Sequence, residues 1–150
     1  MPLERTLVIA KPDAVGQAVV GKIVHRFESE GLRLVAIKSI RPDKKGVEGF
    51  YKEHAGKPFF PGLVAFMSSG PFVPMVWEGE GAIAKVRAIN GATNPAAAEE
   101  GTLRKVWGTD QRRNLVHSSD SPSSAEREIA WFFDDFELTP YDPEAWRTAG

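Results

Sequence analysis

One histidine in this chain stands in a setting that could support covalent chemistry. His117 follows the apolar pair Leu115-Val116 and precedes a run of small hydroxyl and carboxyl residues from Ser118 to Ser121. A neutral imidazole carries a lone pair at neutral pH, so this histidine could act as a nucleophile. Many histidines at strand ends are structural, and the local sequence by itself leaves both roles open.

The other two histidines do not join it in a recognisable metal site. His25 and His54 fall in predicted helices. We interpret His25 as a surface residue and His54 as a partly buried structural residue that could sit near a site. Histidines at positions 25, 54 and 117 do not have the spacing of a metal-binding triad.

Basic residues at scattered positions could supply a phosphate site. Lys11 ends the first apolar run and Arg87 lies on a predicted helix. The segment from 90 to 114 shows little periodicity, and such long irregular stretches in compact domains are often functional. A triphosphate of about four negative charges needs cationic compensation of this kind, although each residue alone could be a solvated surface charge. The phosphate donors in the irregular segment are Thr93, Arg104, Arg112 and Arg113.

Two glycine patterns approach known phosphate motifs and depart from them. The run from Gly16 to Lys22 has P-loop spacing, but Ile23 stands where Ser or Thr should bind Mg²⁺. The run from Gly79 to Ala84 fits a loose dinucleotide pattern, but its glutamates would repel a pyrophosphate. We interpret both as turns before helices and keep the P-loop as a competing hypothesis.

The composition is that of a globular domain without strong electrostatic bias. The chain has 150 residues, 42% of them hydrophobic, and a formal net charge of −1. This balance predicts no general attraction to nucleic acid or to anionic membranes. The chain has no cysteine, which excludes disulfides, a thiolate nucleophile and a Cys-built metal site. The apolar run before Lys11 is too short for a signal peptide or a membrane span, so we expect a cytoplasmic protein.

Apolar periodicity predicts four strands with helices between them. We expect strands at 7–10, 32–40, 72–77 and 115–116. Pro71 and Pro74 favour an edge or irregular position for the third strand. Helices are predicted near 23–27 with Gly31 as C-terminal cap, from Asp43 to His54, and at 63–67, 82–90 and 121–133. This order suggests a single α/β domain of the ferredoxin-like kind, with an extended arm after residue 133.

Several short motifs in one order resemble the nucleoside diphosphate kinase family. The resemblance runs from about Glu4 to Phe133. The matching segments are Thr6 to Asp13, Arg26 to Glu28, Lys57 to Val64, Ser69 to Pro71, Gly91 to Pro95, Gly101 to Arg104 and Asn114 to His117. A set of independent motifs is far more specific than any one of them.

The resemblance implies a fold, a reaction and an assembly. The fold is an antiparallel four-stranded ferredoxin-like sheet covered by helices. The reaction is Mg²⁺-dependent, ping-pong transfer of the γ-phosphate from a nucleoside triphosphate, mainly ATP, to nucleoside diphosphates. The family is usually a homo-oligomer, a hexamer or a tetramer built from dimers.

The resemblance also implies a role for individual residues. His117 would be phosphorylated, Glu128 would orient its imidazole, and Ser119 would join the same network. Phe59 would stack on the base, which predicts weak discrimination among bases. The residues that would bind or steer phosphates and sugar are Lys11, Tyr51, Arg87, Thr93, Arg104 and Asn114.

Two positions depart from the family pattern. Ser118 and Arg112 stand where the family usually has glycine, and a side chain would cost stability if either residue had positive φ. These replacements are the only support for an alternative function, a non-catalytic nucleotide-binding or regulatory module on the same fold. We expect a kinase-like domain at 1–133 and an extension at 134–150 that could lie at a subunit interface.

Overall fold

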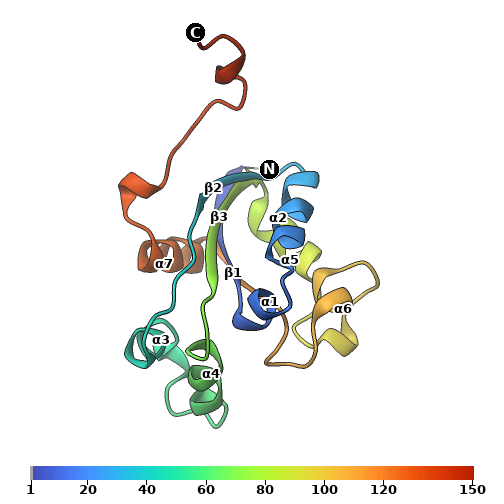
Figure 1. The fold of residues 1–150 in the computed structure, drawn as a ribbon, viewed down its shortest axis with the longest axis vertical. Helices are drawn as coiled ribbons and strands as arrows, with labels where there is room; N and C mark the ends of the chain where they lie inside the picture. The colour runs from blue at the N-terminus through green and yellow to red at the C-terminus, as the bar shows by residue number, and fades with distance from the viewer. Residues whose placement is uncertain (1) are drawn as a thin grey trace.

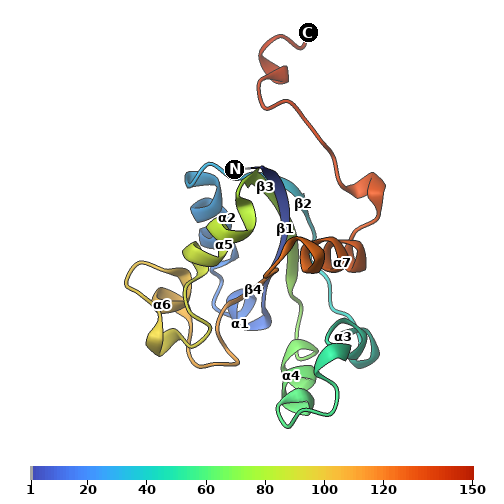
Figure 2. The same cartoon turned by 180° about the vertical axis from the view of Figure 1, so that it is seen from behind.

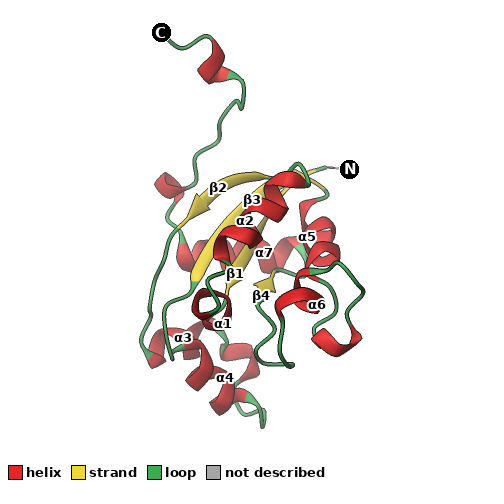
Figure 3. Ribbon diagram, turned by 45° about the vertical axis from the view of Figure 1, so that its right-hand side comes forward, coloured by secondary structure: helices red, strands yellow, loops and turns green. Residues whose placement is uncertain are grey.

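The computed structural model describes residues 2–150 and is built on one antiparallel sheet. Its strands are β1 (Leu3–Ala10), β2 (Arg33–Ile37), β3 (Val73–Glu80) and β4 (Val116–Ser118), in the order β2-β3-β1-β4. Every neighbouring pair is antiparallel. Figure 3 shows the long central strands β1 and β3 flanked by the shorter ones. The predicted ferredoxin-like architecture is confirmed.

Helices cover both faces of the sheet. One core contains Val8 and Ala10 of β1 with α2 (Val20–Ser29) and α5 (Ala82–Asn90). The other contains Leu7 and Ile9 with α3 (Lys44–Phe50), α4 (Phe60–Met67) and α7 (Pro122–Phe132). Figures 1 and 2 show α2 and α5 on the side of the sheet opposite α7. Because side chains alternate along a strand, one apolar run serves both cores.

The remaining elements are short and lie in connections. They are the helices α1 (Pro12–Gly16) and α6 (Leu103–Trp107), and the 3₁₀ turns Lys52–His54, Pro95–Ala97, Asp135–Glu137 and Ala145–Arg147. The predicted irregular segment 90–114 therefore contains one 3₁₀ turn and α6. The predicted helix from Asp43 to His54 is α3 followed by a separate 3₁₀ turn.

Local capping chemistry sets several helix ends where the sequence predicts them. The Asp43 side chain accepts the N–H of Gly46 at 2.8 Å and starts α3. Ser121 accepts the N–H of Ser124 at 3.2 Å, with Pro122 in the first turn of α7. Gly31 has φ of +87° after α2, as expected for a glycine C-cap. These ends required no long-range information.

Of the two alternatives predicted for the third strand, an edge or an irregular position, the edge position is wrong, whereas the pairing of β3 with β2 is irregular between Leu34 and Ala36. β3 lies between β1 and β2, with Pro74 opposite Ile9 of β1. The carbonyl of Pro74 accepts the N–H of Lys38, which follows the end of β2 at Ile37. The N–H that proline lacks would point to that same side, beyond the regular β2 ladder. A proline is tolerated in a central strand because it faces the frayed end of its neighbour.

The C-terminal segment leaves the body of the molecule. Residues 139–150 are all exposed and run away from the sheet in Figure 1. Their aromatic residues are Tyr141 and Trp146, the latter 68% exposed. Among residues 2–150, none of the helices is long and apolar enough to cross a membrane.

Candidate active site

A polar cavity of about 400 Å³ opens beside β4 and gathers residues from across the sequence. Eight of the predicted site residues line it: Lys11, Tyr51, Arg87, Thr93, Arg104, Asn114, His117 and Glu128. They come from the ends of β1, α3 and α5, from the irregular segment, and from β4 and α7. Because β4 is an edge strand, groups from both faces of the sheet can meet beside it.

His117 is held by a buried carboxylate. Its Nε2 lies 3.0 Å from Oε1 of Glu128 on α7, and the Ser119 hydroxyl donates to the same oxygen at 2.9 Å. The rings of Phe50 and Tyr51 meet the imidazole edge-on, with centroids 5.7 and 6.2 Å away. A carboxylate partner fixes the proton on Nε2, so the lone pair of the neutral ring is on Nδ1.

The charge of Glu128 is maintained by its hydrogen bonds. Burial acts to raise the pKa of Glu128, but the hydrogen bonds from His117 and Ser119 together with charge interactions with His117 and Arg127 outweigh it, and the pKa lies below its usual value. The side chain therefore stays ionised at neutral pH. An ionised carboxylate orients the imidazole and stabilises positive charge that develops on it.

Lys11 is buried at the floor of the cavity. Its Nζ donates to the carbonyl of Arg112 at 2.7 Å and to Oδ1 of Asn114 at 2.8 Å. Burial lowers the pKa of Lys11 to about 8, with Arg104 and Arg112 adding to the effect and Asp13 opposing it. The amine is still mostly protonated at pH 7, and its positive charge lacks a carboxylate in direct contact.

Arg104 links the irregular segment to the sheet. Its guanidinium donates to the carbonyls of Gly91, Asn114 and Val116 at 2.7, 3.2 and 2.7 Å. Burial lowers the pKa of Arg104 to about 10, with nearby Arg87 contributing, so the group remains charged at neutral pH. A cation partly desolvated in this way attracts an anion strongly.

Tyr51 contributes a neutral hydroxyl to the cavity wall. Burial raises the pKa of Tyr51 above its usual range, with the charge of Glu128 adding to the effect. The phenol therefore stays protonated and can donate a hydrogen bond at any physiological pH.

Two predicted site residues do not line the cavity. Ser119 is fully buried behind it, where its hydroxyl also accepts the N–H of Leu7 at 3.3 Å. Phe59 is 45% exposed just before α4, with its ring 5.4 Å from that of His54. Since His54 itself lines the cavity, Phe59 lies next to the cavity wall.

The cavity also includes residues that were not predicted to be part of it. These are Glu53, His54, Leu63, Val116, Ser118, Asp120 and Ser124. His54 is half-buried, as expected. The sequence left open whether His54 lies near a site, and the structure shows that it lines the polar cavity. Asp120 and Ser124 could have been found from their place between His117 and Glu128.

The two departures from the family pattern carry no backbone strain. Among residues 2–150, the non-glycine residues with positive φ are Ala18 and Leu115. Ser118 continues β4 and accepts a hydrogen bond from Nδ2 of Asn90 at 3.1 Å. The Arg112 guanidinium lies where a Cβ on Gly62 would fall, 2.5 Å from Nη1. The alternative function loses its only support.

Neither glycine pattern forms a phosphate loop. Nζ of Lys22 lies over the Trp107 ring, 5.6 Å from its centroid, and Lys22 does not line the polar cavity. At the second pattern, Oε1 of Glu4 accepts the N–H of Ile83 at 3.1 Å. The start of α5 is therefore capped by the protein's own carboxylate, which repels a phosphate.

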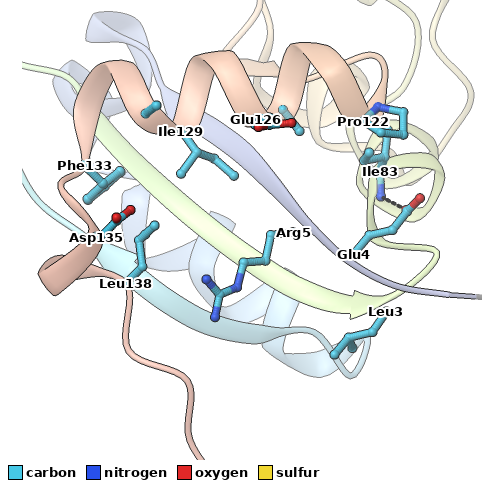
Figure 4. Close-up of a pocket in the computed structure, with 12 residues that line it drawn as sticks. Leu3, Glu4, Arg5, Ile83, Pro122, Glu126, Ile129, Phe133, Asp135 and Leu138 are labelled. Atoms are coloured by element: carbon cyan, nitrogen blue, oxygen red, sulfur yellow. Dashed lines mark hydrogen bonds between the residues drawn. The ribbon is translucent and has the colours of Figure 1, made fainter.

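A second groove, of about 500 Å³, runs along α7 and β1 (Figure 4). Its lining is largely apolar and includes Ile83, Ile129 and Phe133, with Arg5 and Glu126 among the polar residues. None of the predicted site residues lines it. The convergence of histidine, lysine and arginines is confined to the polar cavity.

A nucleophilic imidazole facing buried cations is suited to accept and pass on a phosphoryl group, which places this α/β sandwich among the phosphotransferases. A family model described as nucleoside diphosphate kinase matches residues 4–138. The nucleoside diphosphate kinase of Thermosynechococcus vestitus is 52% identical over 141 residues, covering 94% of each chain. That of Persephonella marina is 51% identical over 138 residues, covering 92% of this chain and 99% of its own.

Solved structures agree with the sequence relatives. The Aquifex aeolicus nucleoside diphosphate kinase superimposes with a TM-score of 0.90 at 44% identity, covering 92% of this chain and all of the other. The Halobacterium salinarum enzyme, solved in complex with CDP, superimposes with a TM-score of 0.91 at 46% identity, covering 96% of each chain. The chain belongs to the nucleoside diphosphate kinase family and is an enzyme that transfers phosphate between nucleotides. The family's general mechanism is ping-pong transfer through a phosphohistidine.

Proposed function

We propose that His117 is the phosphate carrier and that Nδ1 is the atom phosphorylated. The observation that carries this assignment is the contact of Nε2 with Glu128, which leaves the other ring nitrogen free. The side chain is 25% exposed and lines the polar cavity, so a phosphate can reach it. His54 lines the same cavity, but its Nδ1 lies 3.2 Å from Nζ of Lys57.

The reaction proceeds in two balanced halves. Nδ1 forms a bond to the γ-phosphorus of a nucleoside triphosphate, and the bond from that phosphorus to the bridging oxygen breaks. The nucleoside diphosphate leaves with the electron pair, while the Nε2 proton stays hydrogen-bonded to Glu128. A terminal phosphate oxygen of a second nucleoside diphosphate then attacks the phosphorus, and the nitrogen–phosphorus bond breaks to restore the lone pair.

The cations around His117 position the phosphates and offset their charge. Lys11, Arg87 and Arg104 are the cationic groups, and Tyr51 and Thr93 provide hydroxyls. Phosphoryl transfer depends mainly on such positioning and charge stabilisation. Asn114 steers the phosphates through Lys11, since its Oδ1 accepts from Nζ. The amide Nδ2 of Asn114 donates to the carbonyls of Thr93 and Gln111, each at 3.1 Å.

Phe59 is the proposed platform for the base. Its exposed ring beside His54 offers a flat apolar surface at the side of the cavity. Stacking reads the π-face that all bases share rather than their hydrogen-bonding edges. We therefore propose a broad range of nucleoside diphosphate acceptors, with ATP as the main donor. The CDP bound by the Halobacterium relative is compatible with this range.

We propose that Mg²⁺ enters with the nucleotide. Residues 2–150 contain no cluster of three metal-ligating side chains, and Mg²⁺ commonly takes one or two carboxylates besides phosphate oxygens and water. Asp120 fits that requirement. It lines the cavity, and a hydrogen bond from Ser124 holds the pKa of the Asp120 carboxyl below its usual value. When bound, the ion would offset charge on the phosphates.

A phosphoenzyme assay tests the assignment. Incubation with γ-labelled ATP and Mg²⁺ should yield an acid-labile, base-stable phosphoenzyme that passes its label to an added nucleoside diphosphate. His117→Ala should abolish the label, because the attacking nitrogen is gone. His54→Ala is the matched control, a second histidine of the same cavity, and should still be labelled. EDTA should prevent labelling. Normal labelling of His117→Ala would refute the assignment.

The exposed arm supports a proposal about assembly. We propose a homo-oligomer, a hexamer or a tetramer built from dimers, in which residues 134–150 form an extension that contacts a second copy. Exposed Tyr141 and Trp146 on the arm support this, since large apolar side chains without partners favour association. The cytoplasm, where nucleotides are made and used, is the proposed location.

A further inference from the structure

The backbone between Asn114 and His117 contains a strained turn. Leu115 has φ of +77°, and the N–H of Val116 donates to the carbonyl of Asn114 at 2.9 Å. A hydrogen bond spanning two residues around a positive φ is a γ-turn of the rare type. A bulky residue in this conformation is costly and persists only when its surroundings impose it.

The start of α1 imposes that conformation. Oδ2 of Asp13 accepts the N–H of Leu115 at 3.0 Å, and the Leu115 carbonyl accepts the N–H of Lys11 at 2.9 Å. Both backbone polar groups of Leu115 are thereby bound by the Lys11-Pro12-Asp13 corner. The Leu115 side chain is fully buried, which anchors the turn from its other side.

We propose that Asp13 is a positioning residue for phosphoryl transfer: by holding the Leu115 turn it sets the places of Asn114 on one side and His117 on the other. Asp13 does not line the cavity, so it acts through these neighbours. The proposal rests on the proposed function, because Asp13 can affect the reaction only if His117 and Lys11 take part in it. Its geometry involves residues 102 positions apart in sequence.

The Asp13 carboxylate also acts on the charge of Lys11. Among the groups that face Lys11, Asp13 and Asp110 favour the protonated amine, whereas burial, Arg104 and Arg112 oppose it. Burial raises the pKa of Asp13 itself, with Lys11 and the N–H of Leu115 opposing that rise. Removing the negative charge of Asp13 should therefore let Lys11 lose its proton at a lower pH.

Two substitutions separate the hydrogen bond from the charge. In Asp13→Asn an amide oxygen can still accept the Leu115 N–H, but the charge is lost. We expect the alkaline fall of kcat/KM, which reports the free enzyme, to move from about pH 8 in the wild type to lower pH. In Asp13→Ala the turn loses its tether as well. The rate of His117 phosphorylation at pH 6.5 should then fall on the order of 100-fold, as expected for misplaced reacting groups.

The controls distinguish this proposal from simple destabilisation and from failure of the proposed function. Asp43→Asn alters another aspartate that accepts a backbone N–H and does not line the cavity, and it should leave both the rate and the pH profile unchanged. An unshifted alkaline limb in Asp13→Asn, or wild-type labelling in Asp13→Ala, overturns the role of Asp13. If the wild type forms no acid-labile phosphoenzyme, the proposed function fails instead.

Discussion

At the scale of single residues, some polar atoms of the cavity have hydrogen-bond partners within the protein, and others are left to interact with a ligand. Nε2 of His117 has a partner in Glu128, which leaves Nδ1 as the ring nitrogen proposed to take the phosphate. Lys11 is buried, and among residues 2–150 no carboxylate is in direct contact with its amine. Burial lowers the pKa of Lys11 to about 8. In the proposed reaction, an incoming phosphate would supply negative charge beside it. Because the positive charge of Lys11 is only partly offset by nearby carboxylates, the cavity attracts anions.

The Ser118 position gives a prediction at this scale. Ser118→Gly would restore the usual family residue, yet we expect it to lower the free energy of unfolding by about 1–2 kcal/mol. Ser118 is not at positive φ, so glycine relieves no strain, and the buried Nδ2 of Asn90 loses its acceptor. Urea unfolding measures the change. Ser118→Ala, which removes the hydroxyl alone, should be destabilised less. A Ser118→Gly protein more stable than wild type would contradict the account.

At the scale of elements, the connections determine where the site residues meet. The corner between β1 and α1 binds the Leu115 turn ahead of β4, and Arg104 of α6 binds the carbonyls on either side. Both contacts come from short helices within the connections, Asp13 from α1 and Arg104 from α6. Both hold the chain at the start of β4, and the first ties it to the end of β1.

The connections before and after α2 provide a matched pair of substitutions. Ala18 is exposed and has φ of +60°, so Ala18→Gly should raise the free energy of unfolding by about 0.5–1 kcal/mol by relieving left-handed strain. Gly31 has φ of +87°, and a Cβ there would meet only Nζ of Lys85 at 4.0 Å. Gly31→Ala should therefore destabilise by about 1 kcal/mol through its backbone alone. Thermal unfolding of both variants tests the pair, and shifts of the same sign would contradict it.

At the scale of the whole molecule, the polar cavity and the exposed arm occupy different surfaces. The polar cavity lies beside β4, whereas residues 139–150 project from the far end of α7 and line no part of that cavity (Figure 1). The residues that connect α7 to the arm remain in contact with the rest of the fold, because Nζ of Lys38 pairs with Oε2 of Glu137 at 3.1 Å. A single chain can therefore build the whole phosphate site.

Deletion of residues 139–150 tests the proposed assembly. The exposed arm adds little to the folded core, so the shortened protein should keep its unfolding midpoint at concentrations where both forms are monomeric. It should associate at least about tenfold more weakly, the equivalent of about 1.4 kcal/mol of lost contact. Sedimentation velocity over a concentration series measures the association. Phosphoenzyme formation serves as the control and should persist. An unchanged distribution of mass would exclude the arm from the interface.

The sequence by itself determined the four strands and the longer helices, and it predicted which residues would gather at one site. Helix ends at Asp43, Ser121 and Gly31 follow from local capping chemistry, and the motif set predicted His117 and its cationic partners as site residues. Eight of the ten proposed site residues line one cavity, and Ser119 and Phe59 lie directly behind and beside it.

Only the tertiary structure decided what depends on pairing between distant segments. The central place of β3, despite Pro74, depends on where β2 ends. The Leu115 turn depends on Asp13, and the buried charge of Lys11 depends on Asn114, 103 positions away. Local propensity describes each residue by its neighbours along the chain. Strand order, backbone strain and desolvation are set by neighbours in space, which the sequence does not list.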